Sequence, residues 1–375
     1  MSRQRLSLPK IVVSIIALAT FMGAFSLPLQ AKQFEFKKDD DNFVYLLTNR
    51  KPFNSVIQFR RASDGSLRWM HEVPTGGKGT GATGVDPLGS QDSLALSGDG
   101  HLVLAVNSGS NEISVLKLVG DGLVWRDKVW SGGEFPNSIA LSGDLVYVLN
   151  AKGSSPNITG FRLDPEGSLR FVPGAQVNLP PGSAGANDIQ FSQDGTKLVV
   201  TVSGTKQILV FQVGDNGIAG APSTATSAGA SPFGVRFGRN GIAVISEAAG
   251  SASSYDFDSA DMLNVISSAV PDTQAASCWI SLNRSKTFAY VSNTGSGTIS
   301  SYQIDGNGAL TLAKAVAATT AGAPIDSSLS RDSKFLYVVD SANGKILILT
   351  VNGGDLSLVG SVPSLPTSSQ GIAAQ

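Results

Sequence analysis

The sequence is poor in the residues that build disulfides and most metal sites. Its 375 residues include one cysteine, Cys278, and two histidines, His71 and His101. A single cysteine excludes an intramolecular disulfide. Neither histidine has a second His or Cys at ligand spacing, so we expect no metal site of that kind and no bound cofactor. These counts do not decide whether the protein has a Ca²⁺ site built from oxygen ligands alone.

Charge is also scarce, at 15% of the residues, whereas glycine is abundant with 42 copies. Such a chain suits an all-β globular protein better than a helical or disordered one. Residues 1–31 contain three basic and no acidic residues, so the remainder carries 25 Lys+Arg against 29 Asp+Glu, a net charge near −4. That balance offers no broad basic surface and predicts no nucleic-acid partner.

The N-terminus carries an apolar run, from Ile11 to Phe25, which follows three basic residues and precedes Pro28. This order is typical of a signal peptide, which we place at residues 1–31, followed by a leader at 32–42. The protein is then expected in the periplasm or outside the cell, with no stable membrane insertion after cleavage. The alternative is an uncleaved anchor, for which the run is short.

The rest of the chain repeats one pattern. A short apolar strand, a turn and a β-branched run are followed by a loop, a third strand, a turn rich in Gly and a weaker fourth strand. Equivalent first strands begin near residues 92, 137, 187, 233, 278 and 325, at intervals of 45 to 50 residues. The seven central runs are "FVYLLTN", "HLVLAVN", "LVYVLN", "KLVVTV", "IAVISE", "FAYVSN" and "FLYVVD".

Four antiparallel strands at this period predict the blade of a β-propeller, and seven copies predict a seven-bladed ring over residues 43–375. The first copy begins directly at its second strand, "FVYLLTN". We therefore expect Gly371 to Gln375 to supply the innermost strand of blade 1 and to close the ring. Closure would remove free sheet edges.

The segments "FSQDGTKLVVTV", "SRDSKFLYVVD" and "ISSYQIDGNGAL" resemble the lactonase family of seven-bladed propellers. This family includes 6-phosphogluconolactonase-like enzymes and carboxymuconate cyclases, and propellers with the "YVTN" repeat look related. The resemblance extends over Phe43 to Gln375. It implies the propeller fold and, as an activity to test, lactone chemistry.

In a propeller, the loops between blades and between second and third strands share one face, around the mouth of the central channel. Polar residues recur at these positions, and two interpretations are open: a polar funnel for a ligand, or turn residues that bond their own backbone. The positions are Asn49, Arg50, Asp92, Asn107, Asn137, Asn150, Asn187, Asp188, Glu247, Cys278, Trp279, Asn293, Asp326 and Asp340.

The resemblance also implies which positions would carry chemistry in cyclase-type relatives. Asn187 stands where they have a histidine, and Phe233 and Thr294 stand where they have arginines. Their glutamate survives as Glu247. Arg236 lies nearby, but on the alternate face of its strand if the register is regular.

We therefore predict a ligand mouth formed by Asn187, Asp188, Trp279 and Asp326, with Glu247 as the candidate general base. The favoured hypothesis is an exported lactonase-like propeller that binds a small polar molecule or a protein partner and has lost most catalytic residues. The alternative is a lactone hydrolase or cyclase that uses Glu247. The sequence does not decide whether the protein is an enzyme.

Overall fold

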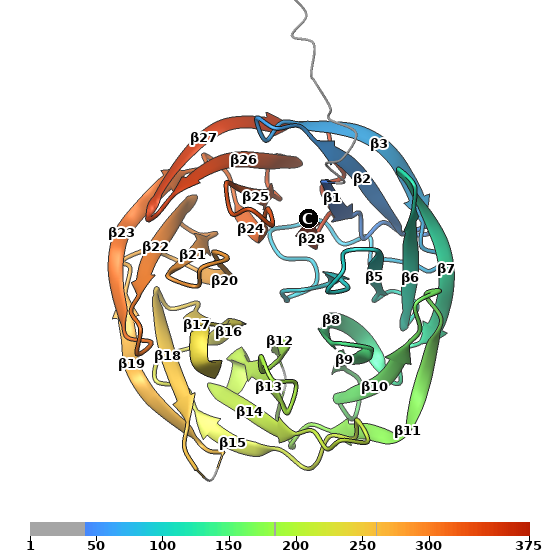
Figure 1. The fold of residues 1–375 in the computed structure, drawn as a ribbon, viewed down its shortest axis with the longest axis horizontal. Helices are drawn as coiled ribbons and strands as arrows, with labels where there is room; N and C mark the ends of the chain where they lie inside the picture. The colour runs from blue at the N-terminus through green and yellow to red at the C-terminus, as the bar shows by residue number, and fades with distance from the viewer. Residues whose placement is uncertain (1–41, 184, 260) are drawn as a thin grey trace, which may run out of the picture. The chain divides into compact units, whose positions relative to one another are not determined.

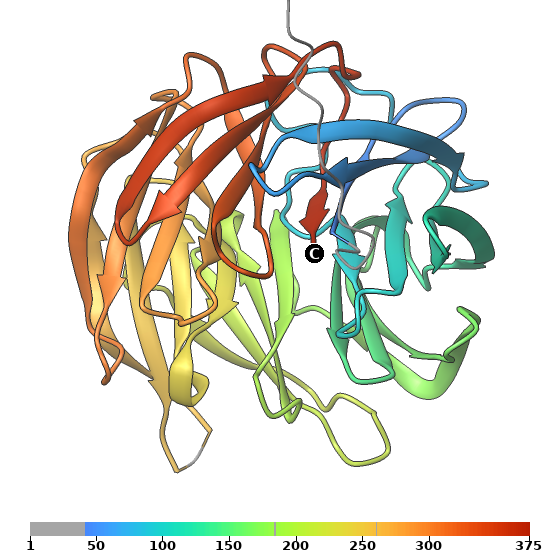
Figure 2. The ribbon, with the colours of Figure 1, turned by 45° about the horizontal axis from the view of Figure 1, so that its top comes forward.

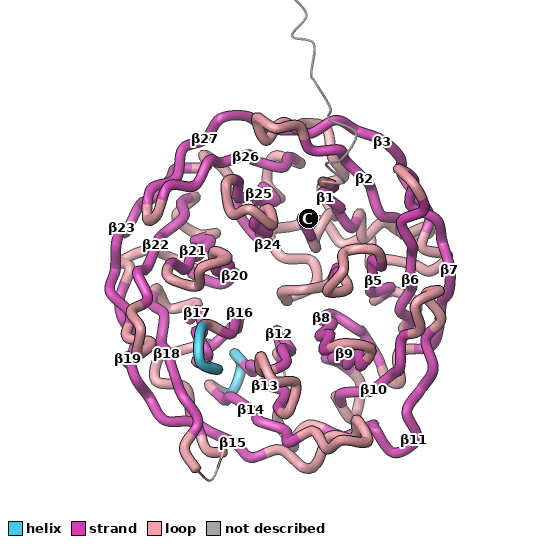
Figure 3. Tube along the Cα trace, in the orientation of Figure 1, coloured by secondary structure: helices cyan, strands magenta, loops and turns pink. Residues whose placement is uncertain are grey.

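The computed structural model describes residues 42–375 except 184 and 260, and most of these residues form β-strands (Figures 1 and 3). Seven antiparallel sheets of four strands form a ring, which confirms the seven-bladed propeller. The predicted signal peptide and nearly all of the leader fall on residues 1–41, outside the described residues.

Each blade runs from an innermost strand to an outermost one. The strands of the first three blades, in that order, are Ile372–Ala374 (β28), Phe43–Leu47 (β1), Ser55–Arg61 (β2) and Leu67–Pro74 (β3); Leu94–Leu96 (β4), Leu102–Asn107 (β5), Glu112–Val119 (β6) and Gly122–Trp130 (β7); Glu134–Ser142 (β8), Leu145–Lys152 (β9), Asn157–Leu163 (β10) and Leu169–Asn178 (β11).

The last four blades follow the same order. Their strands are Ala186–Phe191 (β12), Lys197–Val202 (β13), Gln207–Gln212 (β14) and Ser223–Thr226 (β15); Pro232–Phe237 (β16), Ala243–Glu247 (β17), Ser251–Phe257 (β18) and Leu263–Pro271 (β19); Ser277–Leu282 (β20), Phe288–Asn293 (β21), Thr298–Ile304 (β22) and Leu310–Thr319 (β23); Pro324–Leu329 (β24), Phe335–Asp340 (β25), Lys345–Asn352 (β26) and Asp355–Val362 (β27).

The second strands are continuous apolar runs because neighbouring blades cover both of their faces. Every residue of β1, β5 and β25 is buried. The outermost strands instead mix exposed and half-buried positions, as in β3 and β19. The core therefore lies between the blades.

The C-terminal strand closes the ring as the sequence predicted (Figures 1 and 2). Strand β28 pairs antiparallel with β1, with Leu46 opposite Ile372 and Val44 opposite Ala374. The pairing continues beyond β28, because the backbone N–H of Gln375 donates to the carbonyl of Phe43 at 2.9 Å. Blade 1 thus joins the two ends of the propeller.

The pairing of the first and second strands is irregular near the channel mouth in five blades. In blade 5, for example, the register shifts between Pro232 and Val235. A bulge of this kind re-aims side chains. The expectation that Arg236 points away from the channel-lining residues is therefore wrong, and its side chain bonds to Asp92 and Asp188.

In the part of the chain that the structure describes, no helix is long and apolar enough to cross a membrane. The helices there are two single 3₁₀ turns, Ser203–Thr205 (η1) and Arg239–Gly241 (η2), drawn in cyan in Figure 3.

Candidate functional site

A segment of the chain itself fills the channel mouth. Residues 75–93, between β3 and β4, form the longest linker between blades, and they run into the centre of the ring (Figure 1). Within this linker, residues 86–92 lie against several blades, and we call them the plug. The Gln91 side chain bonds both the N–H and the carbonyl of Ile280 in blade 6, each at 2.9 Å. The plug is therefore anchored directly to the wall of the channel.

Two of the predicted ligand-binding residues hold this plug. The Asn187 amide donates to the carbonyl of Gly89 at 2.7 Å. The indole N–H of Trp279 donates to the carbonyl of Ser90 at 2.8 Å, and the Trp279 side chain is buried. Both side chains face the plug, where they contact the protein's own backbone. Their role in ligand binding stays a prediction.

Asp188 and Asp326 lie in a buried cluster of charges around Arg236. The guanidinium forms two hydrogen bonds of 2.7 Å with Asp92 and lies 3.5 Å from Asp188. Burial, and then the charge of Asp92, raise the pKa values of Asp188 and Asp326 well above the usual range of aspartate, and Arg236 opposes the rise. Among the described residues, no group of three or more His, Cys, Asp or Glu is arranged to hold a metal ion.

Glu247 is buried away from the other four predicted residues. Its carboxylate accepts hydrogen bonds from the hydroxyls of Ser227, Ser251 and Ser253 at 3.0, 2.5 and 2.7 Å. It also accepts one from the backbone N–H of Gly229 at 2.7 Å. These donors come from its own blade and from the linker that leads into it.

The place of Glu247 recurs from blade to blade. It is the last residue of a second strand, and in several blades a polar side chain at or near this end approaches a glycine of the preceding linker so closely that a Cβ would overlap with it. We call this contact the linker clasp. The pairs are Asn107 with Gly77, Asn150 with Gly133, Glu247 with Gly229, and Asp340 with Gly322.

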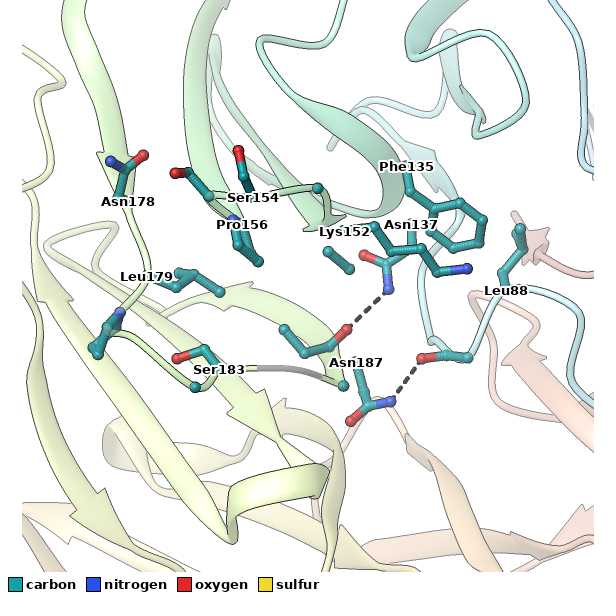
Figure 4. Close-up of a pocket in the computed structure, with 18 of the residues that line it drawn as sticks. Leu88, Phe135, Asn137, Lys152, Ser154, Pro156, Asn178, Leu179, Ser183 and Asn187 are labelled. Carbon is teal, nitrogen blue, oxygen red and sulfur yellow. Dashed lines mark hydrogen bonds between the residues drawn. The ribbon is translucent and has the colours of Figure 1, made fainter.

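An open cavity lies beside the plug, between blade 3 and the linker to blade 4 (Figure 4). Its volume is about 1000 Å³, at the upper end of the usual range for small-molecule sites. Of the five predicted site residues, only Asn187 lines it. Its main walls are residues 86–89 of the plug, 151–156 at and after the end of β9, 178–183, and 185–187.

Phe135 gives this cavity an aromatic wall. Its backbone is left-handed, with φ of 59°, at the start of β8, and the residues that directly precede the first strands of blades 4, 5 and 6, Gly185, Ser231 and Ala276, are left-handed too. A bulky residue rarely adopts this conformation, and such strain is often found at functional sites. The ammonium group of Lys152 lies 3.5 Å from the centre of the Phe135 ring. The cavity therefore combines an apolar face with a positive charge.

Two buried polar atoms in the cavity lining have no hydrogen-bond partner among the described residues. One is Oδ1 of Asn137, whose amide donates to the carbonyl of Ala186 at 3.0 Å (Figure 4). The other is Oγ of Ser183. Buried polar atoms are nearly always paired, because an unpaired one costs about 1–3 kcal/mol. Both atoms therefore keep unused hydrogen-bonding capacity in the lining of the cavity.

Asp86 brings a titratable group to the same cavity. Burial raises the pKa of Asp86 to about 6, although hydrogen bonds from the Gln370 side chain and the Gly89 N–H oppose the rise. An acid with such a pKa can gain or lose a proton near neutral pH. Sequence reasoning missed Asp86 because it lies outside the repeat. The unusual length of its linker was the signal that could have identified it.

Solved structures with the same fold come from several bacteria. A "putative 6-phosphogluconolactonase" from Bacteroides fragilis superposes with a TM-score of 0.70 at 19% identity, over 91% of this chain and 100% of that one. The periplasmic gluconolactonase PpgL of Pseudomonas aeruginosa has a TM-score of 0.68 at 16% identity, over 88% and 99% of the two chains. A comparison with curated protein sequences found no match.

The family resemblance has direct support within the chain. Residues 242–328, from the second strand of blade 5 into blade 7, match the model of the family described as Lactonase, 7-bladed beta-propeller. This match covers β17, which ends with Glu247, and all of blade 6. It confirms that the chain resembles the lactonase family of seven-bladed β-propellers.

Proposed function

We propose that this protein is an exported lactonase-like propeller that binds a small polar ligand in the cavity between blades 3 and 4. The observation that carries the proposal is the pair of unpartnered atoms, Asn137 Oδ1 and Ser183 Oγ, in the lining of that cavity. Hydroxyl groups of a ligand can bond both atoms. Phe135 and Leu88 beside them suit the apolar face of a ring.

Binding can be measured by calorimetry with glucono-1,5-lactone, gluconate and 6-phosphogluconate as probes. Ser183→Ala removes one hydroxyl and should weaken binding by about fivefold, the usual scale for one hydrogen bond. Ser285→Ala, in an exposed turn of blade 6, is the matched control and should leave affinity unchanged. Equal affinity of Ser183→Ala and wild type would contradict the proposed site.

Lactone hydrolysis is a second candidate, and it is Asp86 that favours it. Its carboxylate would take a proton from water as the water oxygen adds to the lactone carbonyl carbon. The ring C–O bond would then break, and the departing alkoxide would receive the proton, giving the hydroxy acid. Glu247, named by the family resemblance, does not line the cavity and is already bonded by four donors.

A panel of sugar and aromatic lactones separates these possibilities. If the protein hydrolyses one of them, Asp86→Asn should reduce turnover by about a hundredfold or more, and Glu247→Gln should have a smaller effect. A larger loss of turnover in Glu247→Gln than in Asp86→Asn would identify Glu247 as the general base. No turnover by wild type, together with measurable binding, would support the binding function alone.

Export is the remaining part of the proposal. It rests on the basic and then apolar pattern of residues 1–31 and agrees with the periplasmic location named for the Pseudomonas aeruginosa relative. N-terminal sequencing of the exported protein should find a start close to Lys32. Recovery of intact Met1 from a membrane fraction would favour the anchor.

A further inference from the structure

The outer surface of the ring is chemically uneven. Three of the four tryptophans of the chain are exposed, and they lie on the outermost strands β3 and β7. An exposed phenylalanine follows on β11. The outermost strands of blades 4 to 7, β15, β19, β23 and β27, contain no aromatic residue. We call Trp69, Trp125, Trp130 and Phe171 the aromatic belt.

The three strands that carry the belt follow one another around one side of the ring. Figure 1 shows β3, β7 and β11 following one another along the outer edge. Trp125 lies over Gly76, at the end of blade 1, while its neighbour Arg126 lies beside Gly167 of blade 3. Strand β7 therefore links the surfaces of the blades on either side.

Most rings of the belt are held in place by the protein. Trp69 meets Phe59 edge to face, with centroids 5.6 Å apart, and Phe171 meets Phe161 in the same way at 6.1 Å. The indole N–H of Trp125 donates to the carbonyl of Thr75 at 2.9 Å. All four belt residues remain exposed to solvent. Rings fixed in this way lose little conformational entropy when a ligand stacks on them.

Charged groups alternate with the rings. Arg68 precedes Trp69, Arg126 follows Trp125 and Arg170 precedes Phe171, and all three arginines are exposed. The three strands together carry four Arg or Lys residues and two acids, so the belt is biased towards positive charge. Arginine can hold a carboxylate through two parallel hydrogen bonds.

This alternation decides which class of partner fits. Protein–protein interfaces also favour aromatic residues and arginine, but there these residues surround a closely packed apolar core, and a membrane-surface contact needs a continuous apolar layer. The belt has neither feature. It offers separate, fixed rings with cations between them, repeated from blade to blade. A chain of sugar rings that carries carboxylates presents the matching pattern, with apolar C–H faces and acidic edges.

We propose that the aromatic belt of blades 1 to 3 binds an acidic polysaccharide. Sugar faces would stack on Trp69, Trp125 and Phe171, and carboxylates would bond Arg126 and Arg170. The belt lies on the outermost strands and the cavity opens beside the channel, so this surface is independent of the proposed ligand site.

Affinity electrophoresis through gels that contain polygalacturonate tests the proposal, with dextran as the neutral polysaccharide. Wild type should be retarded by polygalacturonate and not by dextran, and the retardation should fall as salt rises. The double variant Trp69→Ala/Phe171→Ala should bind about tenfold more weakly, from two lost stacking contacts. Arg126→Gln/Arg170→Gln should weaken binding and flatten its salt dependence.

Two outermost strands that carry no aromatic residue supply a matched control. Val265 in β19 and Leu358 in β27 occupy equivalent positions and are 50% and 49% exposed, against 47% for Trp69 and 49% for Phe171. Val265→Ala/Leu358→Ala should bind polygalacturonate like wild type. Ser183→Ala in the cavity should also leave this binding unchanged.

Several results would overturn the proposal. These are no retardation of wild type, equal retardation by dextran, or equal loss of binding in the belt variant and the control variant. Binding of wild type to vesicles with anionic lipids in place of polygalacturonate would assign the belt to a membrane surface instead.

Discussion

Glu247 and Asp86 are both carboxylates near the mouth-side ends of the blades, but they belong to different kinds of structure. Glu247 occupies a place that recurs around the ring, and a linker clasp saturates it with hydrogen bonds. Asp86 lies in the one long linker, borders a cavity and has a pKa of about 6. The recurring position thus serves the fold, whereas the irregular segment carries a carboxyl group that borders a cavity and titrates near neutral pH.

The largest loss of stability is expected when the strand that closes the ring is removed. Deleting Gly371 to Gln375 removes β28 and leaves the inner edge of β1 unpaired. We expect the free energy of unfolding to fall by more than about 4 kcal/mol, the range of severe lesions. Denaturant unfolding of the truncated and full-length proteins measures this. An unchanged midpoint would show that the C-terminal strand does not stabilise the ring.

The plug should be the next most sensitive feature. Gln91→Ala leaves the N–H and the carbonyl of Ile280 without their buried partner. The expected loss of stability is about 2–4 kcal/mol, from two unsatisfied backbone groups. The control is Gln303→Ala, at an exposed position of β22, which should change stability by less than about 0.5 kcal/mol. Equal effects of the two substitutions would mean that the plug contributes little to the fold.

The raised pKa of Asp86 should make stability depend on pH. Its folded pKa is about 6 and its usual value is 3.8, so between these pH values the folded chain binds more protons than the unfolded chain. The protonated Asp86 therefore makes its full contribution to the free energy of unfolding below about pH 4. This contribution, up to about 3 kcal/mol, is lost as the pH rises through about 6.

Urea unfolding at several pH values tests this linkage. Asp86→Asn should be less sensitive than wild type to a change from pH 4 to pH 7. The comparison with wild type is needed because the raised pKa values of Asp188 and Asp326 give slopes of the same sign. Identical pH profiles of wild type and variant would show that Asp86 titrates normally.

The smallest expected effect concerns a single linker clasp. Gly229→Ala would place a methyl group against the carboxylate of Glu247 and should cost about 1–3 kcal/mol, as in other overpacked sites. At Gly220 an added Cβ would make only an ordinary contact with the carbonyl of Gln212, so Gly220→Ala is the control. Thermal unfolding should separate the two variants. If both unfold like wild type, the close approach at Gly229 is not needed.

The sequence predicted more of the fold than of the site. The strand pattern located the blades, and the missing first strand of blade 1 identified the closing role of the C-terminus. The predicted site was built from positions within the repeat, and the structure brings Asn187 and Trp279 together only through the plug. Asp86, Phe135, Lys152 and Ser183 were not selected, because each lies in or beside a linker or loop whose path the repeat does not specify.

The sequence by itself determined the architecture, because strand periodicity and turn glycines are local properties that recur at each blade. Only the tertiary structure decided which polar groups are available. Hydrogen bonds with the plug satisfy Asn187 and Trp279, and bonds within its own blade and linker satisfy Glu247. Asn137 Oδ1 and Ser183 Oγ are left without partners among the described residues. Whether a polar atom is paired depends on which segments meet in space. At the channel mouth, the path of the long linker determines which segments meet.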